Sequence, residues 1–121
     1  MRYVPGETSQ SFAGHYATEI TENWFALTDT KKEVGLALIY PADVFKALWL
    51  WQSYGGWRGL YHLAVEPWVG YPVNLAQAVA TGRHKTLPAL GSVAYEVAVA
   101  VYSGVQSVDR VTHKGGYYVP S

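Results

Sequence analysis

The sequence predicts an all-β protein, a β-sandwich formed by one domain over residues 1–121. Short runs rich in β-branched, aromatic and other apolar residues recur along the chain, and proline, glycine and polar residues separate them. Only residues 74–80 have a helix-forming composition, whereas residues 92–102 alternate with the period of a strand. A chain of 121 residues has the length of a single domain with a thin core.

The first third of the chain contains the signals of a strand followed by a hairpin. Residues 1–10 hold a Pro-Gly pair and little pattern, which favours an arm or a short edge strand. Residues 11–20 are typical of a strand with widely spaced large apolar side chains. The apolar runs 23–28 and 34–40 flank the polar segment 29–33, so we expect them to pair as a hairpin.

The remaining elements follow in order after Pro41, which ends the hairpin. They are an apolar run at 44–52 stopped by Gly55-Gly56, a strand at 60–65, a short helix at 74–80 closed by Gly82, a long strand at 92–102 and a short strand near 105–111. In the long strand, Val93, Tyr95, Val97, Val99 and Val101 share one face, and Ala94, Glu96, Ala98 and Ala100 share the other.

The composition combines high apolar content with few charges. Half of the residues are hydrophobic, and the 15% that are charged fall below the quarter usual for globular domains. Surplus apolar surface favours self-association, so we expect a homodimer. The formal net charge of zero gives no electrostatic reason to expect nucleic acid or an anionic membrane as a partner.

Several classes of site are excluded by the residues present. The absence of cysteine excludes disulfides and thiolate metal sites. No metal-ligand spacing, phosphate loop or nucleotide fingerprint occurs, so we expect neither a metal nor a cofactor. No run of 18 apolar residues and no signal segment is present, which predicts a cytoplasmic protein.

The tryptophan-rich run Lys46–Gly59, KALWLWQSYGGWRG, suggests a binding surface. Strand alternation places Trp49 and Trp51 on one face. A tight turn at Gly55-Gly56 would bring Tyr54, Trp57 and Arg58 near the sheet edge. Flat aromatic rings with a polar handle suit the face of a sugar ring, although these rings are equally suited to a core. Arg58 is suited to paired hydrogen bonds with a sugar or to an exposed salt bridge.

A lone carboxylate, Glu66, follows the strand at 60–65 and precedes a Pro-Trp turn. Alternation places His62, Ala64 and Glu66 on one face, with His62 and Glu66 about 13 Å apart at about 3.3 Å per residue. Two interpretations of Glu66 remain open at this point: a solvated or turn-capping carboxylate, and a general base.

The order of these features resembles the C-terminal part of the aldose 1-epimerase (galactose mutarotase-like) family. The stretch from Leu60 to Gly91 contains a strand ending on Glu66, then Tyr71-Pro72, Asn74 with a small-residue segment, and a glycine. The resemblance covers about residues 24–102. It implies that Glu66 is the catalytic base for sugar anomerisation, and that this chain is half of a supersandwich whose fold needs more than twice this length. The family's acid histidine lies in the half that has no counterpart here.

Two functions of different class follow. The first is a carbohydrate-binding protein, with residual sugar anomerisation by Glu66 and with Glu66 in a concave groove bordered by tryptophan or tyrosine. Its substrate-binding residues would be Trp49, Trp51, Tyr54, Arg58 and His62. The second is a non-catalytic, self-associating binding or assembly module that has lost the epimerase chemistry.

Overall fold

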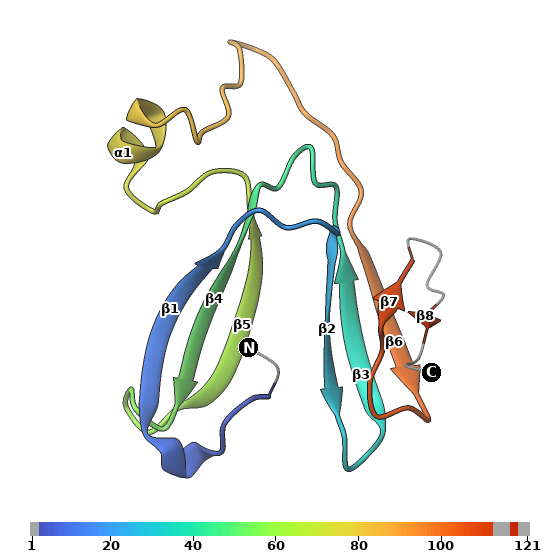
Figure 1. Cartoon of the computed structure of the whole chain (residues 1–121). Coiled ribbons are helices and arrows are strands. Elements are labelled where there is room, and N and C mark those ends of the chain that lie inside the picture. The colour runs from blue at the N-terminus through green and yellow to red at the C-terminus, as the bar shows by residue number, and fades with distance from the viewer. Residues whose placement is uncertain (1–2, 113–116, 119–121) are drawn as a thin grey trace. The chain divides into compact units, whose positions relative to one another are not determined.

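The computed structural model describes residues 3–112 and 117–118 (Figure 1). The elements are η1 (Glu7–Ser9), β1 (Ser11–Ala17), β2 (Trp24–Asp29), β3 (Val34–Ile39), β4 (Ala47–Tyr54), β5 (Tyr61–Trp68), α1 (Leu75–Ala80), β6 (Ala98–Ser103), β7 (Arg110–Val111) and β8 (Tyr117–Tyr118). They belong to two compact units. Unit 1 comprises Met1–Ile20 and Phe45–Thr86, and unit 2 comprises Thr21–Val44 and Leu87–Ser121.

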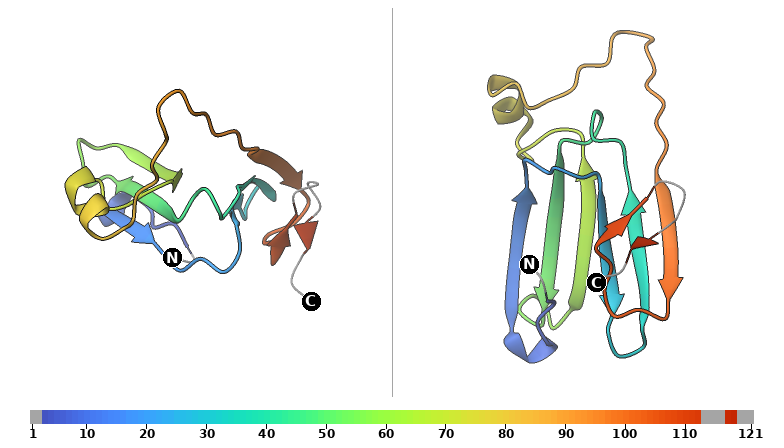
Figure 2. Two further views of the ribbon diagram at one scale, coloured as in Figure 1. Left: turned by 90° about the horizontal axis from the view of Figure 1, so that it is seen from above. Right: turned by 45° about the vertical axis from the view of Figure 1, so that its right-hand side comes forward.

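The predicted all-β class is confirmed. Two antiparallel sheets of three strands each account for most of the regular structure: β1-β4-β5 in unit 1 and β2-β3-β6 in unit 2 (Figures 1 and 2). The described helical residues are limited to α1 and the single 3-10 turn η1. The segment 1–10 therefore contains a 3-10 turn where the sequence suggested an arm or an edge strand.

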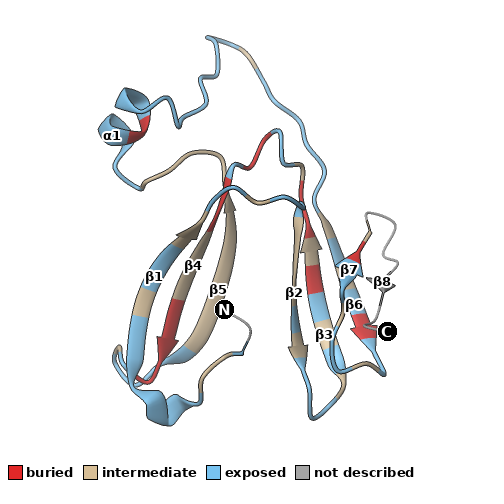
Figure 3. Cartoon of the chain, viewed as in Figure 1, coloured by how far each residue is buried: buried red, intermediate tan, exposed pale blue. Residues whose placement is uncertain are grey.

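The sheet of unit 1 is built around β4, its central strand. Much of β4 is buried, whereas β1 is mainly exposed (Figure 3). Beyond β4, Gly55 has a φ of +89°, a conformation that a side chain rarely adopts. The buried Ser53 hydroxyl donates to the Leu60 carbonyl at 2.8 Å and accepts from the Trp57 amide at 3.1 Å. These bonds fix the tight turn that returns the chain into β5.

Strand β5 extends to Trp68, which corrects the predicted end at residue 65 and the predicted Pro-Trp turn. Pro67 lacks an amide donor, but β5 is an edge strand, where a proline can point its nitrogen away from the sheet. The Lys46 amide donates to the Trp68 carbonyl at 2.9 Å and holds this end of the strand. Glu66 therefore lies within the strand, and Trp68 shares its face.

Helix α1 confirms the predicted short helix. Asn74 is its N-cap, and the Asn74 Oδ1 accepts from the Gln77 amide at 3.0 Å. After the helix, Gly82 has a φ of +67°, as predicted for a C-terminal glycine. None of the helices in the described part of the chain has the length and apolar character needed to cross a membrane.

Unit 2 confirms the predicted hairpin and adds β6 to it. The core lies on one face of this sheet and consists of Ala37, Ile39, Tyr102 and Val111. The Tyr102 ring covers Gly35, where a Cβ atom would lie 2.2 Å from the ring Cζ. The Tyr102 hydroxyl is 2.7 Å from the Thr28 Oγ1, so the ring is held across all three strands.

The last long strand is shorter than predicted, because β6 begins at Ala98 and not at residue 92. The register explains the difference. Ala98 pairs with Ile39, the last residue of β3, and Pro41 ends that strand two residues later. Residues 92–97 therefore have no partner strand within the sheet, in spite of their alternating pattern.

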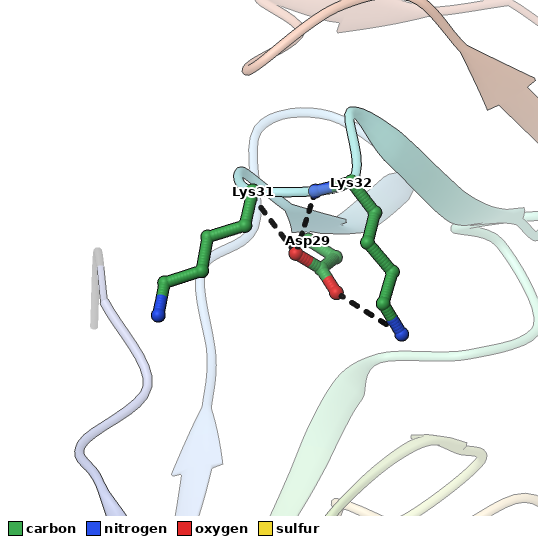
Figure 4. A network of polar contacts seen from close by, with 3 residues as sticks. All are labelled: Asp29, Lys31 and Lys32. Atoms are coloured by element: carbon green, nitrogen blue, oxygen red, sulfur yellow. Dashed lines mark hydrogen bonds and ion pairs between the residues drawn. The ribbon is translucent and has the colours of Figure 1, made fainter.

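The hairpin turn between β2 and β3 is organised by Asp29 (Figure 4). Its Oδ1 accepts from the backbone amides of Lys31 and Lys32 at 3.0 and 3.1 Å, and its Oδ2 lies 4.0 Å from the Lys32 Nζ. The amide of Lys32, then that of Lys31, and more weakly the two lysine charges lower the pKa of Asp29. The carboxylate is solvent-exposed, so its contribution to stability is small.

We expect Asp29→Asn to change how stability depends on pH. Because the folded pKa of Asp29 is below its unfolded value, its contribution is complete above the unfolded pKa and is lost as pH falls through the folded pKa. The melting-temperature difference between wild type and D29N should shrink between about pH 5 and about pH 2. Asp43→Asn, at an exposed aspartate without a hydrogen bond to any described residue, is the control. A constant difference across this range would contradict the role given to Asp29.

Candidate functional site

One face of the β1-β4-β5 sheet carries most of the aromatic side chains of unit 1. The strand register aligns Tyr16, Trp49 and Glu66 in one row across the sheet. The next row contains Gly14, Trp51 and Ala64, and the one after it Phe12, Ser53 and His62. Strand pairing therefore places the predicted residues Trp49, Trp51, His62 and Glu66 on the same face.

Four aromatic rings surround the carboxylate, and together with it we call them the Glu66 cluster: Tyr16, Trp49, Glu66, Trp68 and Tyr71. The Trp49 ring centroid lies 4.6 Å from that of Tyr16 and 5.8 Å from that of Trp68. The Trp68 Nε1 donates to the Glu66 Oε2 at 3.1 Å. All five side chains are half-buried, so the carboxylate is oriented by the indole and still reaches solvent.

The loop after β5 holds Tyr71 against this cluster. The Tyr71 ring lies 5.8 Å from the Tyr16 ring, and the Tyr16 hydroxyl accepts from the Val73 amide at 2.7 Å. The Tyr71 amide donates to the Arg83 carbonyl at 3.1 Å, while the Arg83 guanidinium lies 4.9 Å above the Tyr71 ring. The loop is thus attached both to β1 and to the segment after α1.

A second group of aromatic residues lies nearer the β4–β5 turn, and we call it the Trp51 cluster: Phe12, Trp51, Trp57 and His62. The Trp57 ring lies 5.5 Å from Trp51 and 6.0 Å from Phe12. The His62 ring lies 4.7 Å from Trp51 at an angle of 59°. The His62 Nε2 is buried, and no described residue hydrogen-bonds to it.

Tyr54 and Arg58 do not belong to the strand rows that hold Trp49, Trp51, His62 and Glu66. Tyr54 is 1% exposed and points to the opposite face, where its hydroxyl donates to the Gln52 Oε1 at 3.1 Å. Burial, and then the nearby Tyr61, raise the pKa of Tyr54. Arg58 is exposed, has a φ of +52°, and lies 5.1 Å above the Trp57 ring at the far end of the Trp51 cluster.

Sequence reasoning missed Tyr16, Trp68 and Tyr71. Trp68 carried a usable signal, since a residue two positions after Glu66 shares its face if the strand continues. Tyr16 lies across the sheet, and only the pairing of β1 with β4 brings it to Trp49. Tyr71 depends on the course of a loop, for which the sequence has no periodic signal.

The chemistry available on this face is that of one carboxylate among aromatic rings. Along β5, the residues next to Glu66 on its face are Ala64 and Trp68. His62 is about 13 Å away at strand spacing, and His15 lies on the opposite face, paired with Leu50. Within the described residues, no group of three or more His, Cys, Asp or Glu side chains could hold a metal ion. The face is therefore better suited to binding than to paired acid–base catalysis.

No protein family, curated protein or solved structure matches this chain closely enough to identify a relative. The resemblance to the aldose 1-epimerase family therefore stays a prediction that depends on the residue order from Leu60 to Gly91.

We expect Gly14→Ala to displace Trp49 and to destabilise unit 1. A Cβ atom at residue 14 would lie 2.4 Å from the Trp49 Cη2, so the indole must move off β1. Overpacking of this kind typically costs about 1–3 kcal/mol, and the aromatic near-ultraviolet circular dichroism should weaken. Gly6→Ala is the control, because the nearest heavy atom to its Cβ is 3.9 Å away. Equal stability and equal spectra for the two variants would contradict the position of Trp49 over β1.

Proposed function

We propose that unit 1 binds a carbohydrate on the aromatic face of the β1-β4-β5 sheet. The observation that carries this proposal is the Glu66 cluster, in which half-buried Trp49 and Tyr16 rings stand in one row with a half-buried carboxylate. A sugar ring has an apolar face of C–H groups and an edge of hydroxyl groups. Aromatic rings next to a hydrogen-bond acceptor complement both.

The hydrogen bond from Trp68 supports a binding role for Glu66. An ionised carboxylate has acceptor sites for about four hydrogen bonds. Within the described residues, only the Trp68 indole donates to it. The remaining sites are available to sugar hydroxyls, and hydrogen bonds to an ionised acceptor are about twice as strong as those between neutral groups.

The proposal also includes a catalytic activity, the residual anomerisation of the bound sugar. A base would remove the proton of the anomeric hydroxyl while an acid protonates the ring oxygen. Glu66 fits the base, and the resemblance to aldose 1-epimerases supports this assignment. The described residues around Glu66 supply aromatic rings and no neighbouring histidine, so binding is the better supported function.

We expect Glu66→Gln to weaken the binding of neutral sugars by about tenfold, because the variant loses charge-assisted hydrogen bonds of about 1.5–3 kcal/mol. Tryptophan fluorescence titrated with neutral, acidic and phosphorylated sugars would measure this, with Glu19→Gln as a control at an exposed carboxylate in the same unit. Unchanged fluorescence and melting temperature across the whole panel would contradict the proposal. Polarimetry tests for catalysis. Anomerisation by wild type above the spontaneous rate, together with its loss in E66Q, would assign Glu66 as the catalytic base.

A second function, self-association into a homodimer, is favoured by the other sheet. The face of β2-β3-β6 opposite its core is largely apolar, and Leu27, Leu36 and Val101 form one row across it. Val101 is 80% exposed and Leu36 46% exposed. A second copy of the chain would cover these side chains with a surface of the same apolar character.

We expect Val101→Lys to dissociate this homodimer, because a lysine in an apolar interface loses its hydration. Sedimentation velocity at micromolar concentration should show a dimer for wild type and a monomer for V101K. Leu75→Lys is the control, since Leu75 is 71% exposed on α1 in unit 1. A monomeric wild-type protein would contradict self-association.

A further inference from the structure

The aromatic face is longer than a single sugar ring requires. The Glu66 cluster and the Trp51 cluster lie one after the other along the strands of one sheet face. Its two end residues on β5, His62 and Trp68, are six residues apart, which corresponds to about 20 Å or roughly four linked pyranose rings at about 3.3 Å per residue. Trp57 and Tyr71, in the flanking loops, extend the row at either end.

An arginine lies at each end of this row. The Arg58 guanidinium lies 5.1 Å above Trp57, and the Arg83 guanidinium lies 4.9 Å above Tyr71. Neither arginine forms an ion pair with a described carboxylate. His84 and Lys85 follow Arg83 and add basic character to that end. Each guanidinium therefore has hydrogen-bond donors available beside an aromatic ring.

The face has the opposite character at Glu66. This residue is the one carboxylate in the described rows of the face, and along β5 it lies two residues from Trp68 and four from His62. An anionic group on a ligand would be repelled there and attracted at both ends. A ligand that covers the whole row is thus expected to be long, flat-faced, and anionic toward its ends.

We propose that this face binds a linear acidic oligosaccharide of about four units. The aromatic clusters stack on successive rings, and Arg58 and Arg83 each bind a carboxylate or sulfate of an outer unit. This inference rests on the proposed carbohydrate-binding function and specifies its ligand. Single-stranded nucleic acid also stacks on aromatic rings, but its phosphate at every unit would meet Glu66, and the formal net charge of the chain is zero.

The test is isothermal titration calorimetry with two series of sugars, each from one to four units: an acidic series with uronic acids at its end units and neutral inner units, and neutral chito-oligomers. We expect affinity to rise with length in both series. The acidic tetramer should bind about tenfold more tightly than the neutral tetramer, because charge-assisted hydrogen bonds are the stronger ones. This preference should decrease with increasing salt concentration.

Variants of Arg58 and Arg83 test where the acidic groups of the ligand bind. Arg58→Gln and Arg83→Gln should each weaken binding of the acidic tetramer more than binding of the neutral tetramer, and the double variant should abolish the preference for the acidic one. Arg58→Lys and Arg83→Lys, which keep the charge, should retain part of the preference. Arg110→Gln is the matched control, since Arg110 lies in unit 2 and its Nε is 3.8 Å from the Glu22 carboxylate. Glu66→Gln should increase the preference for the acidic tetramer, because it weakens binding of neutral sugars and removes the repulsion between Glu66 and the ligand's carboxylates.

The outcomes separate this inference from the proposed function. Equal affinity for monomers and tetramers, or no preference for acidic sugars, would overturn the inference while monosaccharide binding still supports the proposed function. Failure of every sugar to bind would overturn both. Tighter binding of a single-stranded oligonucleotide than of any sugar would overturn the acidic oligosaccharide in favour of nucleic acid.

Discussion

The packing of the Trp49 indole over β1 is the contact on which the candidate site depends. The indole lies where a Cβ atom at residue 14 would stand, 2.4 Å from the Trp49 Cη2, so only glycine leaves room for it. From this position the ring contacts Tyr16 on β1 and Trp68 on β5. One side chain of the central strand thus joins all three strands of the sheet.

The same arrangement recurs in the other sheet, where the Tyr102 ring covers Gly35. A glycine in a strand has no side chain to pack, and a neighbouring aromatic ring covers the exposed backbone in its place. The consequences differ between the two units. Tyr102 is buried in a core, whereas Trp49 is half-buried beside a carboxylate, and only the second position leaves an aromatic ring accessible to a ligand.

Polar groups stand beside the aromatic rings at several points along the face. The Trp68 indole donates to Glu66, and Arg58 and Arg83 lie over the Trp57 and Tyr71 rings. The His62 Nε2 is buried beside Trp51 without a hydrogen bond to a described residue. Recognition through such a face would combine non-directional stacking with a few oriented hydrogen bonds, which is the usual division of roles in small-molecule sites.

The sequence by itself determined the all-β class, the hairpin of β2 and β3, the short capped helix, and the faces of individual strands. These depend on local signals: periodicity two, turn residues, and an N-cap at Asn74. Only the tertiary structure decided which strands pair. Pairing allowed β5 to continue through Pro67, because that strand is an edge strand. It also made β6 begin at Ala98, the partner of Ile39. Pairing likewise brought Tyr16 to Trp49, because strand register is a long-range property that local composition does not encode.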